Sequence, residues 1–366
     1  MNNAVPLYPG FSEHSRQAAL ACLTFIEQRA RAQDTPRRFI NWLMQQMADK
    51  DGMSDCAWLI RGDLAAMPDK SRGALQTAWP LWFSHGQAHY EKPVFYCINT
   101  ERPEALRTLL TEVNRRAIFL NLADDGDSFL PKGVLPWFPI GVTAIQDCLP
   151  YDPANAQETR AIVSHALRSL YLDDRHKIAY IATHGERVVL PDLTACDGEM
   201  AWKGMYRIRR DNPPNDLHVR LCGAGKSLSR VLKAAAILEQ HWGVSSDVWS
   251  CPSYTRLAQE AEAAQLASLA DDADELSLSH LHRCMAGEDS PVIAVTDYHH
   301  LIATQLKPFI PGRFMAVGSD SLRRDGANAP RAEWIALCAL KLLADDGKIA
   351  TAQLESAMKQ LRLMSD

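Results

Sequence analysis

The stretch VRLCGAGKSLSRVLKAAAILEQHWGV, residues 219–244, joins an apolar run, a glycine turn and a long amphipathic segment. Its centre, Gly225-Lys226-Ser227, is similar to the end of the phosphate-binding motif G-x-x-x-x-G-K-[ST], whose first glycine turns backbone N–H groups toward the phosphates. That glycine would stand at position 220, where the chain has Arg220. We therefore interpret the stretch as a strand, a structural glycine turn and a helix, and not as a nucleotide site.

The same alternation of strand and helix patterns continues on both sides of this stretch. Downstream, the expected strands are 216–223, 245–251, 290–297 and 313–320, and the expected helices are 227–242, 254–270, 298–310 and 331–344. Upstream, we expect helices at 11–33, 36–50 and 103–116, strands at 55–63, 92–100, 117–126 and 176–185, and a strand, a turn and a helix within 142–171. Such alternation favours parallel sheets with helices on both faces.

These expectations describe an α/β fold of two doubly wound domains with mainly parallel sheets. We place a helical arm at residues 1–34, a first domain at 35–195 and a second domain at 196–366. The polar, glycine-containing segment 191–204 is expected to be a linker between the domains.

Composition narrows the class of protein. The chain has 366 residues, 47% hydrophobic residues and a net charge of −5, which is ordinary for a soluble protein and argues against nucleic-acid or anionic-membrane binding. No apolar run is long enough to span a membrane, and the start shows no secretory signal. The nine cysteines form no C-x-x-C pair, so we expect buried thiols in a cytoplasmic protein.

The histidines offer three candidate pairs for a metal site. These are His85 with His89, His280 with His282, and His299 with His300. His85 and His89 could share a helix face and hold a metal, but no nearby carboxylate or third ligand completes a site there. We expect ordinary core or surface histidines, and no metal.

Several segments together carry a resemblance to a known family. They are TPRRFINWLMQQMADK (35–50), LPYDPANAQETRAIVSHALRSLY (149–171), AYIATHGERVVLP (179–191), MAWKGMYRI (200–208), the opening stretch 219–244, GVSSDVWSCPSYTRLAQ (243–259), AVTDYHHLIATQL (294–306) and RFMAVGSDSL (313–322). In this order they resemble the decarboxylating component of the homodimeric bacterial pyruvate dehydrogenase complex, one of the transketolase-like thiamine diphosphate enzymes. The resemblance implies a contracted pyrimidine-binding domain followed by a transketolase C-terminal-like domain, with the GAGKS turn after the first strand of the latter.

The sequence departs from the family at its cofactor-binding positions. The family's diphosphate-binding domain has no counterpart, and the sequence lacks the glycine-aspartate-glycine motif that holds the cofactor through Mg²⁺; DDGD at 124–127 is expected to be a loop. The family's catalytic glutamate against the aminopyrimidine ring is replaced by Ser71, unless a register shift brings in Asp63 or Asp69. Asn99 and Arg102 fall where the family has aromatic residues lining the pyrimidine pocket. We therefore regard the pocket as degenerate.

The family's histidine-rich loop shows a further loss. It aligns with GVLPWFPIG, residues 133–141, which contains no histidine. We therefore assign no catalytic residue.

Two functional hypotheses remain open, and a third is an unrelated α/β protein. In the first, the chain is non-catalytic alone and serves as a subunit or scaffold of a homo- or heteromeric complex. In the second, it is the pyrimidine and C-terminal half of a split thiamine diphosphate-dependent 2-oxo-acid decarboxylase or transketolase-like enzyme. This chain alone would bind no cofactor, and thiamine diphosphate with Mg²⁺ would require a partner chain with the diphosphate-binding domain. We expect a homodimer, that heteromer, or both. AWPLWF (78–83) and LPWFP (135–139) are candidate contact segments, with core packing as the alternative for each.

Overall fold

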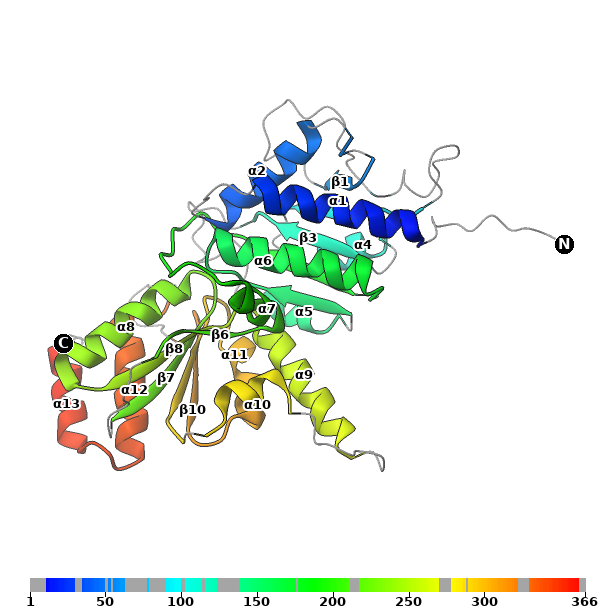
Figure 1. The fold of residues 1–366 in the computed structure, drawn as a ribbon. Coiled ribbons are helices and arrows are strands. Elements are labelled where there is room, and N and C mark those ends of the chain that lie inside the picture. The colour runs from blue at the N-terminus through cyan, green and yellow to red at the C-terminus, as the bar shows by residue number, and fades with distance from the viewer. Residues whose placement is uncertain are drawn as a thin grey trace. The chain divides into compact units, whose positions relative to one another are not determined.

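The computed structural model of the chain, drawn in Figure 1, describes most of its residues. They are 11–29, 35–49, 52–53, 55–62, 78, 90–99, 103–113, 116–123, 138–145, 147–175, 177–210, 217–269, 278–287, 289–321 and 329–361. Contacts within the chain divide it into two compact units, Met1–Asp127 with Gly133–Gly185, and Ser128–Lys132 with Glu186–Asp366.

The first unit is built on a five-stranded parallel sheet. Its strand order is β1 (Trp58–Arg61), β2 (Val94–Ile98), β3 (Ala117–Asn121), β5 (Ile178–Ala182) and β4 (Cys148–Tyr151). Every residue of β2, β3 and β5 is buried, as expected for inner strands that are covered on both faces.

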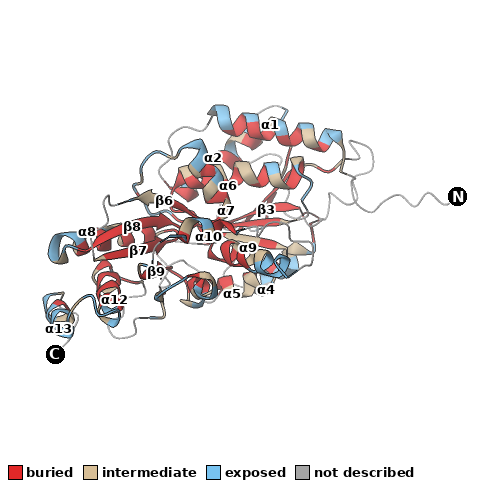
Figure 2. Ribbon diagram, turned by 60° about the horizontal axis from the view of Figure 1, so that its bottom comes forward, coloured by how far each residue is buried: buried red, intermediate tan, exposed pale blue. Residues whose placement is uncertain are grey.

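Helices cover both faces of this sheet, as Figure 2 shows for the two sides of β3. On one side lie α2 (Pro36–Asp49) and α6 (Ala156–Leu167), and on the other lie α4 (Pro103–Leu110) and α5 (Phe138–Thr143). The long helix α1 (Glu13–Arg29) packs on α6 and on the π-helical turn η2 (Arg168–Leu172). The predicted start of α2 is confirmed, because the Thr35 hydroxyl accepts the Arg38 N–H at 3.2 Å.

The second unit is built on a mixed five-stranded sheet. Its order is β10 (Phe314–Val317), β9 (Val292–Val295), β7 (His218–Gly223), β8 (Ser245–Ser250) and β6 (Tyr206–Arg209), with only β6 antiparallel to its neighbour. Its helices are α7 (Ala195–Lys203), α8 (Ser227–Trp242), α9 (Tyr254–Ala267), α10 (His280–Met285), α11 (Leu301–Thr304), α12 (Ala332–Asp345) and α13 (Thr351–Gln360). Helices α8 and α12 pack on each other and on the strands, while α9 contacts α10 and α11. The α/β class with two mainly parallel sheets is thereby confirmed.

The glycine turn between β7 and α8 is structural, as predicted. Gly225 has φ +53°, and a Cβ on Gly223 would lie 3.0 Å from the Leu228 Cα. The buried Ser227 hydroxyl donates to the Ala224 carbonyl at 2.7 Å and accepts the Ala224 N–H at 3.1 Å. These bonds hold the serine inside the turn.

Two segments differ from the sequence expectations. The expected linker 191–204 contains helix α7, which has a capping box between Thr194 and Asp197 and ends at Gly204 with φ +114°. The expected helix 298–310 is interrupted: α11 ends at Thr304, and a 3₁₀ turn, η3 (Lys307–Phe309), follows around Pro308. Pro308 has no N–H to donate to the Thr304 carbonyl four residues earlier, and its ring clashes with that carbonyl, which explains the end of α11.

None of the described helices is long and apolar enough to cross a membrane.

Candidate functional site

The carboxyl edge of the first sheet is the place where an open parallel sheet binds ligands. The residues directly after its strands are Gly62 after β1, Asn99 after β2, Leu122 after β3, Asp152 after β4 and Thr183 after β5. All five strands are parallel, so these residues lie along one edge of the sheet.

Asn99 is the only predicted pocket residue that the described part of the chain contains. It is half-buried and directly follows β2. Ser71 and Arg102 lie outside the described residues, as do Asp63, Asp69 and the segment 124–127. The degenerate pocket of Ser71, Asn99 and Arg102 therefore stays a prediction at all three positions, of which the structure describes only Asn99.

Thiamine diphosphate would need an acid close to the position of Asn99, against the pyrimidine ring. Among the described residues at this edge, Asp152 is a buried acid, but it follows β4, three places from β2 in the sheet. At the usual strand spacing that is about 14 Å away. Glu158, at the start of α6, is fully buried and accepts the Ala154 N–H at 2.6 Å. Asp152 and Glu158 therefore do not supply the acid at the pyrimidine end of the cofactor.

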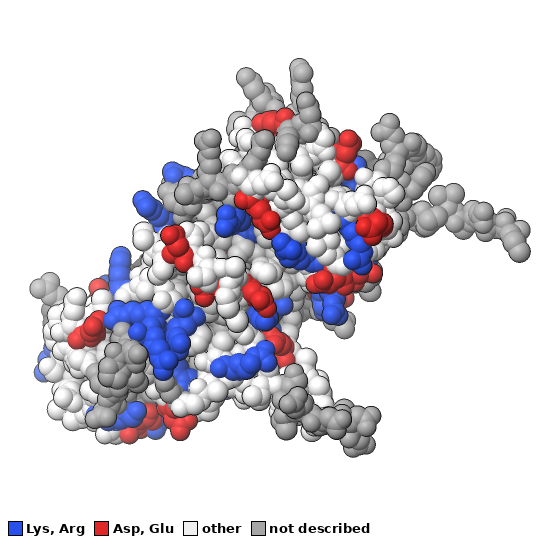
Figure 3. All heavy atoms as spheres, in the orientation of Figure 1, with Lys and Arg blue, Asp and Glu red and all other residues white. Residues whose placement is uncertain are grey.

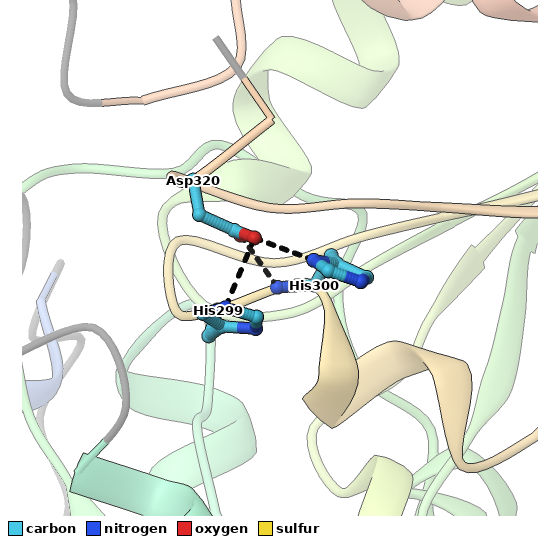
Figure 4. Close-up of side chains that lie close together, drawn as sticks. All are labelled: His299, His300 and Asp320. Atoms are coloured by element: carbon cyan, nitrogen blue, oxygen red, sulfur yellow. Dashed lines mark hydrogen bonds and ion pairs between the residues drawn. The ribbon is translucent and has the colours of Figure 1, made fainter. Parts of the chain in front are cut away.

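A second group of polar side chains lies at the carboxyl edge of the second sheet. His299 and His300 follow β9, and Asp320 follows β10, the parallel neighbour of β9. Figure 4 shows both imidazoles turned toward the Asp320 carboxylate. Asp320 Oδ2 lies 2.5 Å from His300 Nδ1 and 3.2 Å from His299 Nε2. One ligand atom from each of the three residues lies within 4.8 Å of the others.

The backbone contributes to the electrostatics of this His299–His300–Asp320 cluster. The His300 N–H donates to Asp320 Oδ1 at 2.7 Å. Burial raises the pKa of Asp320, but the hydrogen bonds from the His300 side chain and backbone outweigh it, so the pKa lies below its ordinary value. The carboxylate is thus held in its ionised form.

Of the other two histidine pairs, His280 and His282 make structural contacts in and around α10. His280 is buried in α10, its Nε2 lies 2.8 Å from the Met205 carbonyl, and burial lowers its pKa. His282 Nδ1 lies 2.7 Å from the Ser279 hydroxyl that caps α10. Cys284 faces His280, but burial raises the pKa of its thiol to about 11, which disfavours the thiolate a metal would need. His85 and His89 lie outside the described residues.

Lysine and arginine side chains gather over the region of β6 and β8, as Figure 3 shows for one face. On β6, Arg207 Nη1 lies 3.5 Å from Asp247 Oδ2, and its guanidinium stacks 5.4 Å from the Trp249 ring. Arg209 pairs with Glu239 at 2.7 Å. Because Arg207 and Arg209 have acidic partners, these two arginines give no argument for an anion site.

The candidate contact segments fall partly in the core. Phe138 and Pro139, the end of the aromatic loop 135–139, are buried at the start of α5, and the Phe138 ring lies 5.9 Å from Tyr180. For these two residues the alternative of core packing holds, because their apolar surface is covered. Ala78 is also buried. The remaining residues of both segments lie outside the described ones.

Residues 204–333 match the sequence profile described as the transketolase-like TK C-terminal domain. The second unit carries a transketolase-type C-terminal domain. Among curated proteins, the chain is 32% identical to the pyruvate dehydrogenase E1 component of Cupriavidus necator, over 60% of this chain and 26% of the relative. It is 30% identical to that of Pseudomonas aeruginosa, over 62% of this chain and 25% of the relative. The chain thus spans about a quarter of the length of the curated relatives it matches.

Solved transketolases share the fold of both units. Transketolase from Leishmania mexicana superposes with a TM-score of 0.54 at 14% identity, over 96% of this chain and 50% of that one. A split gene transketolase, solved as an inactive β4 tetramer, gives 0.52 at 14% identity, over 86% of this chain and 99% of that one. The resemblance read from the sequence is confirmed: the chain is transketolase-like and is similar to pyruvate dehydrogenase E1 components over part of their length.

Sequence reasoning missed Asp320 as a partner of the two histidines. Twenty residues separate it from His300. A signal was present, because VIAVTDYHH and FMAVGSD each place polar groups directly after an apolar strand. The carboxyl ends of neighbouring parallel strands meet at one edge, but the sequence does not say that β9 and β10 are neighbours.

Proposed function

We propose that this chain is a non-catalytic subunit of a homo- or heteromeric complex, with a pyrimidine-type unit and a transketolase-type C-terminal unit. The observation that carries the proposal is Asn99, at the carboxyl end of β2, where the family resemblance places an aromatic wall of the pyrimidine pocket. An amide offers hydrogen bonds but no extended apolar face for an aromatic ring to stack on.

The sequence at Ser71 supports the same proposal. A serine hydroxyl cannot supply the negative charge that the family's glutamate gives to the aminopyrimidine. Proton transfer by a positioned group typically contributes about 10²–10⁴ in rate, so the loss is large by itself. The hydrophobic core, in contrast, is intact, because every residue of β2, β3 and β5 is buried. The chain therefore has the residues that the fold needs, but not those that the family's chemistry needs.

A second candidate is the split enzyme. It is favoured by the likeness to the split gene transketolase, because the superposition covers 99% of that chain and 86% of this one. In this case a partner with the diphosphate-binding domain would supply Mg²⁺ and diphosphate contacts, and the present chain would cover the pyrimidine end. The active site would then contain Asn99 and Ser71 in place of the usual groups.

Calorimetry separates the two candidates. Thiamine diphosphate with Mg²⁺ is titrated into the purified chain, and then into the chain together with whichever protein co-purifies from the native source. We expect no saturable heat for the chain alone. Heat with the partner present, accompanied by 2-oxo-acid decarboxylation, would establish the split enzyme and end the non-catalytic proposal. Cofactor binding by the isolated chain would contradict both.

The oligomeric state is a further part of the proposal. We expect the isolated chain to form a homodimer through its C-terminal unit. Light scattering after size-exclusion chromatography should then give about twice the chain mass of 40.8 kDa. If the isolated chain has the mass of a monomer and gains mass only when the co-purified protein is added, the homodimer is excluded and the heteromer remains.

A further inference from the structure

The His299–His300–Asp320 cluster is formed by two short segments that the sheet brings together. Strands β9 and β10 pair in parallel, so the chain leaves both of them at the same edge. The histidines come from the segment between β9 and α11, and the aspartate comes from the loop after β10. Each imidazole has a ring nitrogen near the same carboxylate oxygen, Asp320 Oδ2.

One backbone–backbone contact and one contact from the backbone to the Asp320 carboxylate hold these two segments together. The Ser319 N–H donates to the Tyr298 carbonyl at 2.9 Å, and the His300 N–H donates to Asp320 Oδ1 at 2.7 Å. Gly318 makes this approach possible, because a Cβ there would lie 2.3 Å from the His300 nitrogen and 2.6 Å from the Tyr298 oxygen. The three side chains therefore project from a preformed frame.

The spacing of the ligand atoms is close to that of a metal site. Two ligands at about 2.0 Å from a tetrahedral ion lie about 3.3 Å apart. His299 Nε2 and Asp320 Oδ2 are 3.2 Å apart, as such a pair would be. His300 Nδ1 and the same oxygen are at 2.5 Å, a hydrogen-bond distance that would open by less than 1 Å around an ion.

The geometry points to a binding site for a divalent transition metal ion of the Zn²⁺ type, with His299, His300 and Asp320 as its protein ligands. Two imidazole nitrogens and one carboxylate oxygen favour Zn²⁺, Co²⁺ or Ni²⁺ over Mg²⁺ and Ca²⁺, which prefer oxygen ligands. This site is separate from the Mg²⁺ that accompanies thiamine diphosphate in the family, and it does not depend on the proposed function.

Three protein ligands leave a tetrahedral ion one position for water or another small ligand. The side chains remain accessible enough for this, with exposed fractions of 28% for His299, 39% for His300 and 24% for Asp320. Asp297, two residues before His299, is already paired with Arg230. The bound ion would tie the His299–His300 segment to the loop after β10 and present an open coordination position at the sheet edge.

Metal titration of the full chain tests this site. The protein is stripped with a chelator, exchanged into metal-free buffer and titrated with Zn²⁺ by calorimetry and with Co²⁺ by visible absorption. We expect one equivalent of Zn²⁺ per chain and the absorption bands of tetrahedral Co²⁺. Absence of saturable Zn²⁺ binding to the wild-type chain would overturn the proposal, and the hydrogen-bonded cluster would then be a purely structural contact.

Variants locate the ion. His299→Ala and Asp320→Asn should each weaken Zn²⁺ binding at least about tenfold, because losing even an outer partner of a metal ligand typically costs that much. His241→Ala is the matched control, since it removes an exposed histidine of the same unit outside the cluster and should leave the affinity unchanged. Unchanged Zn²⁺ affinity in the double variant His299→Ala with Asp320→Asn would place the ion on other groups, such as the exposed Cys196, and overturn the assignment.

A second measurement needs no variant and so remains decisive if a substituted chain fails to fold. Wild-type crystals soaked in Zn²⁺ should give an anomalous difference peak between the two imidazoles and the Asp320 carboxylate. A peak elsewhere on the chain, with none at the cluster, would refute the site.

Discussion

Arg220 makes an internal contact at the position where a phosphate-binding loop would have a glycine. It stands where a phosphate loop has its first glycine, yet its side chain is buried in β7. Its Nη1 donates to the Met285 carbonyl at 2.9 Å and lies 3.4 Å from the Met285 sulfur. The guanidinium thus ties β7 to α10.

Ser71→Glu is predicted to create no enzymatic activity by itself. The substitution restores the family's acid, but the sequence has no glycine-aspartate-glycine motif to hold the Mg²⁺ and diphosphate. Pyruvate decarboxylation is measured with thiamine diphosphate and Mg²⁺ present, and Ser71→Ala is the control. Turnover by the glutamate variant alone would show that this chain contains a complete cofactor site.

The buried residue Glu91 is predicted to make the free energy of unfolding depend on pH. The carboxyl is 3% exposed, and Oε2 lies 3.6 Å from Arg116 Nε. Burial raises its pKa from 4.5 to about 7, although the charge of Arg116 opposes the shift. Between these values the folded protein keeps a proton that the unfolded chain releases, so the unfolding free energy falls as pH rises through this window.

Glu91→Gln should remove this part of the pH dependence and raise stability above the window relative to wild type. Urea denaturation below, within and above the window measures it. Glu27→Gln is the control, because this exposed carboxylate pairs with Arg168 on the surface of the same unit. A wild-type profile that is flat or rising across the window would contradict the assignment to Glu91.

At the scale of elements, local signals explain most boundaries. Helix α8 begins at Ser227 and ends at Trp242, as predicted, because glycines flank it and its apolar face is continuous. The helix expected at 298–310 is broken by Pro308, which cannot donate to the Thr304 carbonyl, and this signal was visible in the sequence. Strand β6 was missed, since its four residues include two arginines and its partner, β8, lies about 40 residues later.

Gly223→Ala should destabilise the turn between β7 and α8. The added Cβ would lie 3.0 Å from both the Leu228 Cα and the Val231 Cγ2, and the backbone atom cannot move freely. Overpacking of this kind typically costs about 1–3 kcal/mol of unfolding free energy. Chemical denaturation measures it, with Gly185→Ala as the control, because a Cβ there meets nothing within 4 Å. Equal stability of the two variants would show that the turn relaxes at little cost.

At the scale of the whole molecule, each unit has its own sheet and its own buried core. The matched C-terminal domain, residues 204–333, lies entirely within the second unit. Both units are thus expected to have independent stability.

A fragment of residues 186–366 should therefore fold alone. It contains all five strands of the second sheet, so its hydrophobic core is complete without the first unit. Cooperative urea unfolding and dispersed NMR signals would demonstrate it. A fragment that binds hydrophobic dyes and unfolds without a transition would show that the first unit is needed for the core.

The sequence by itself determined the α/β class, most strands and helices, and the family resemblance. These depend on apolar periodicity, on glycine and proline, and on residue order, all of which act over short distances. Only the tertiary structure decided that Asp320 meets His299 and His300, that Phe138 is buried, and that β4 lies far from β2 in the sheet. Strand order is set by which buried faces pack together across the whole chain, and that information is not local to any one segment.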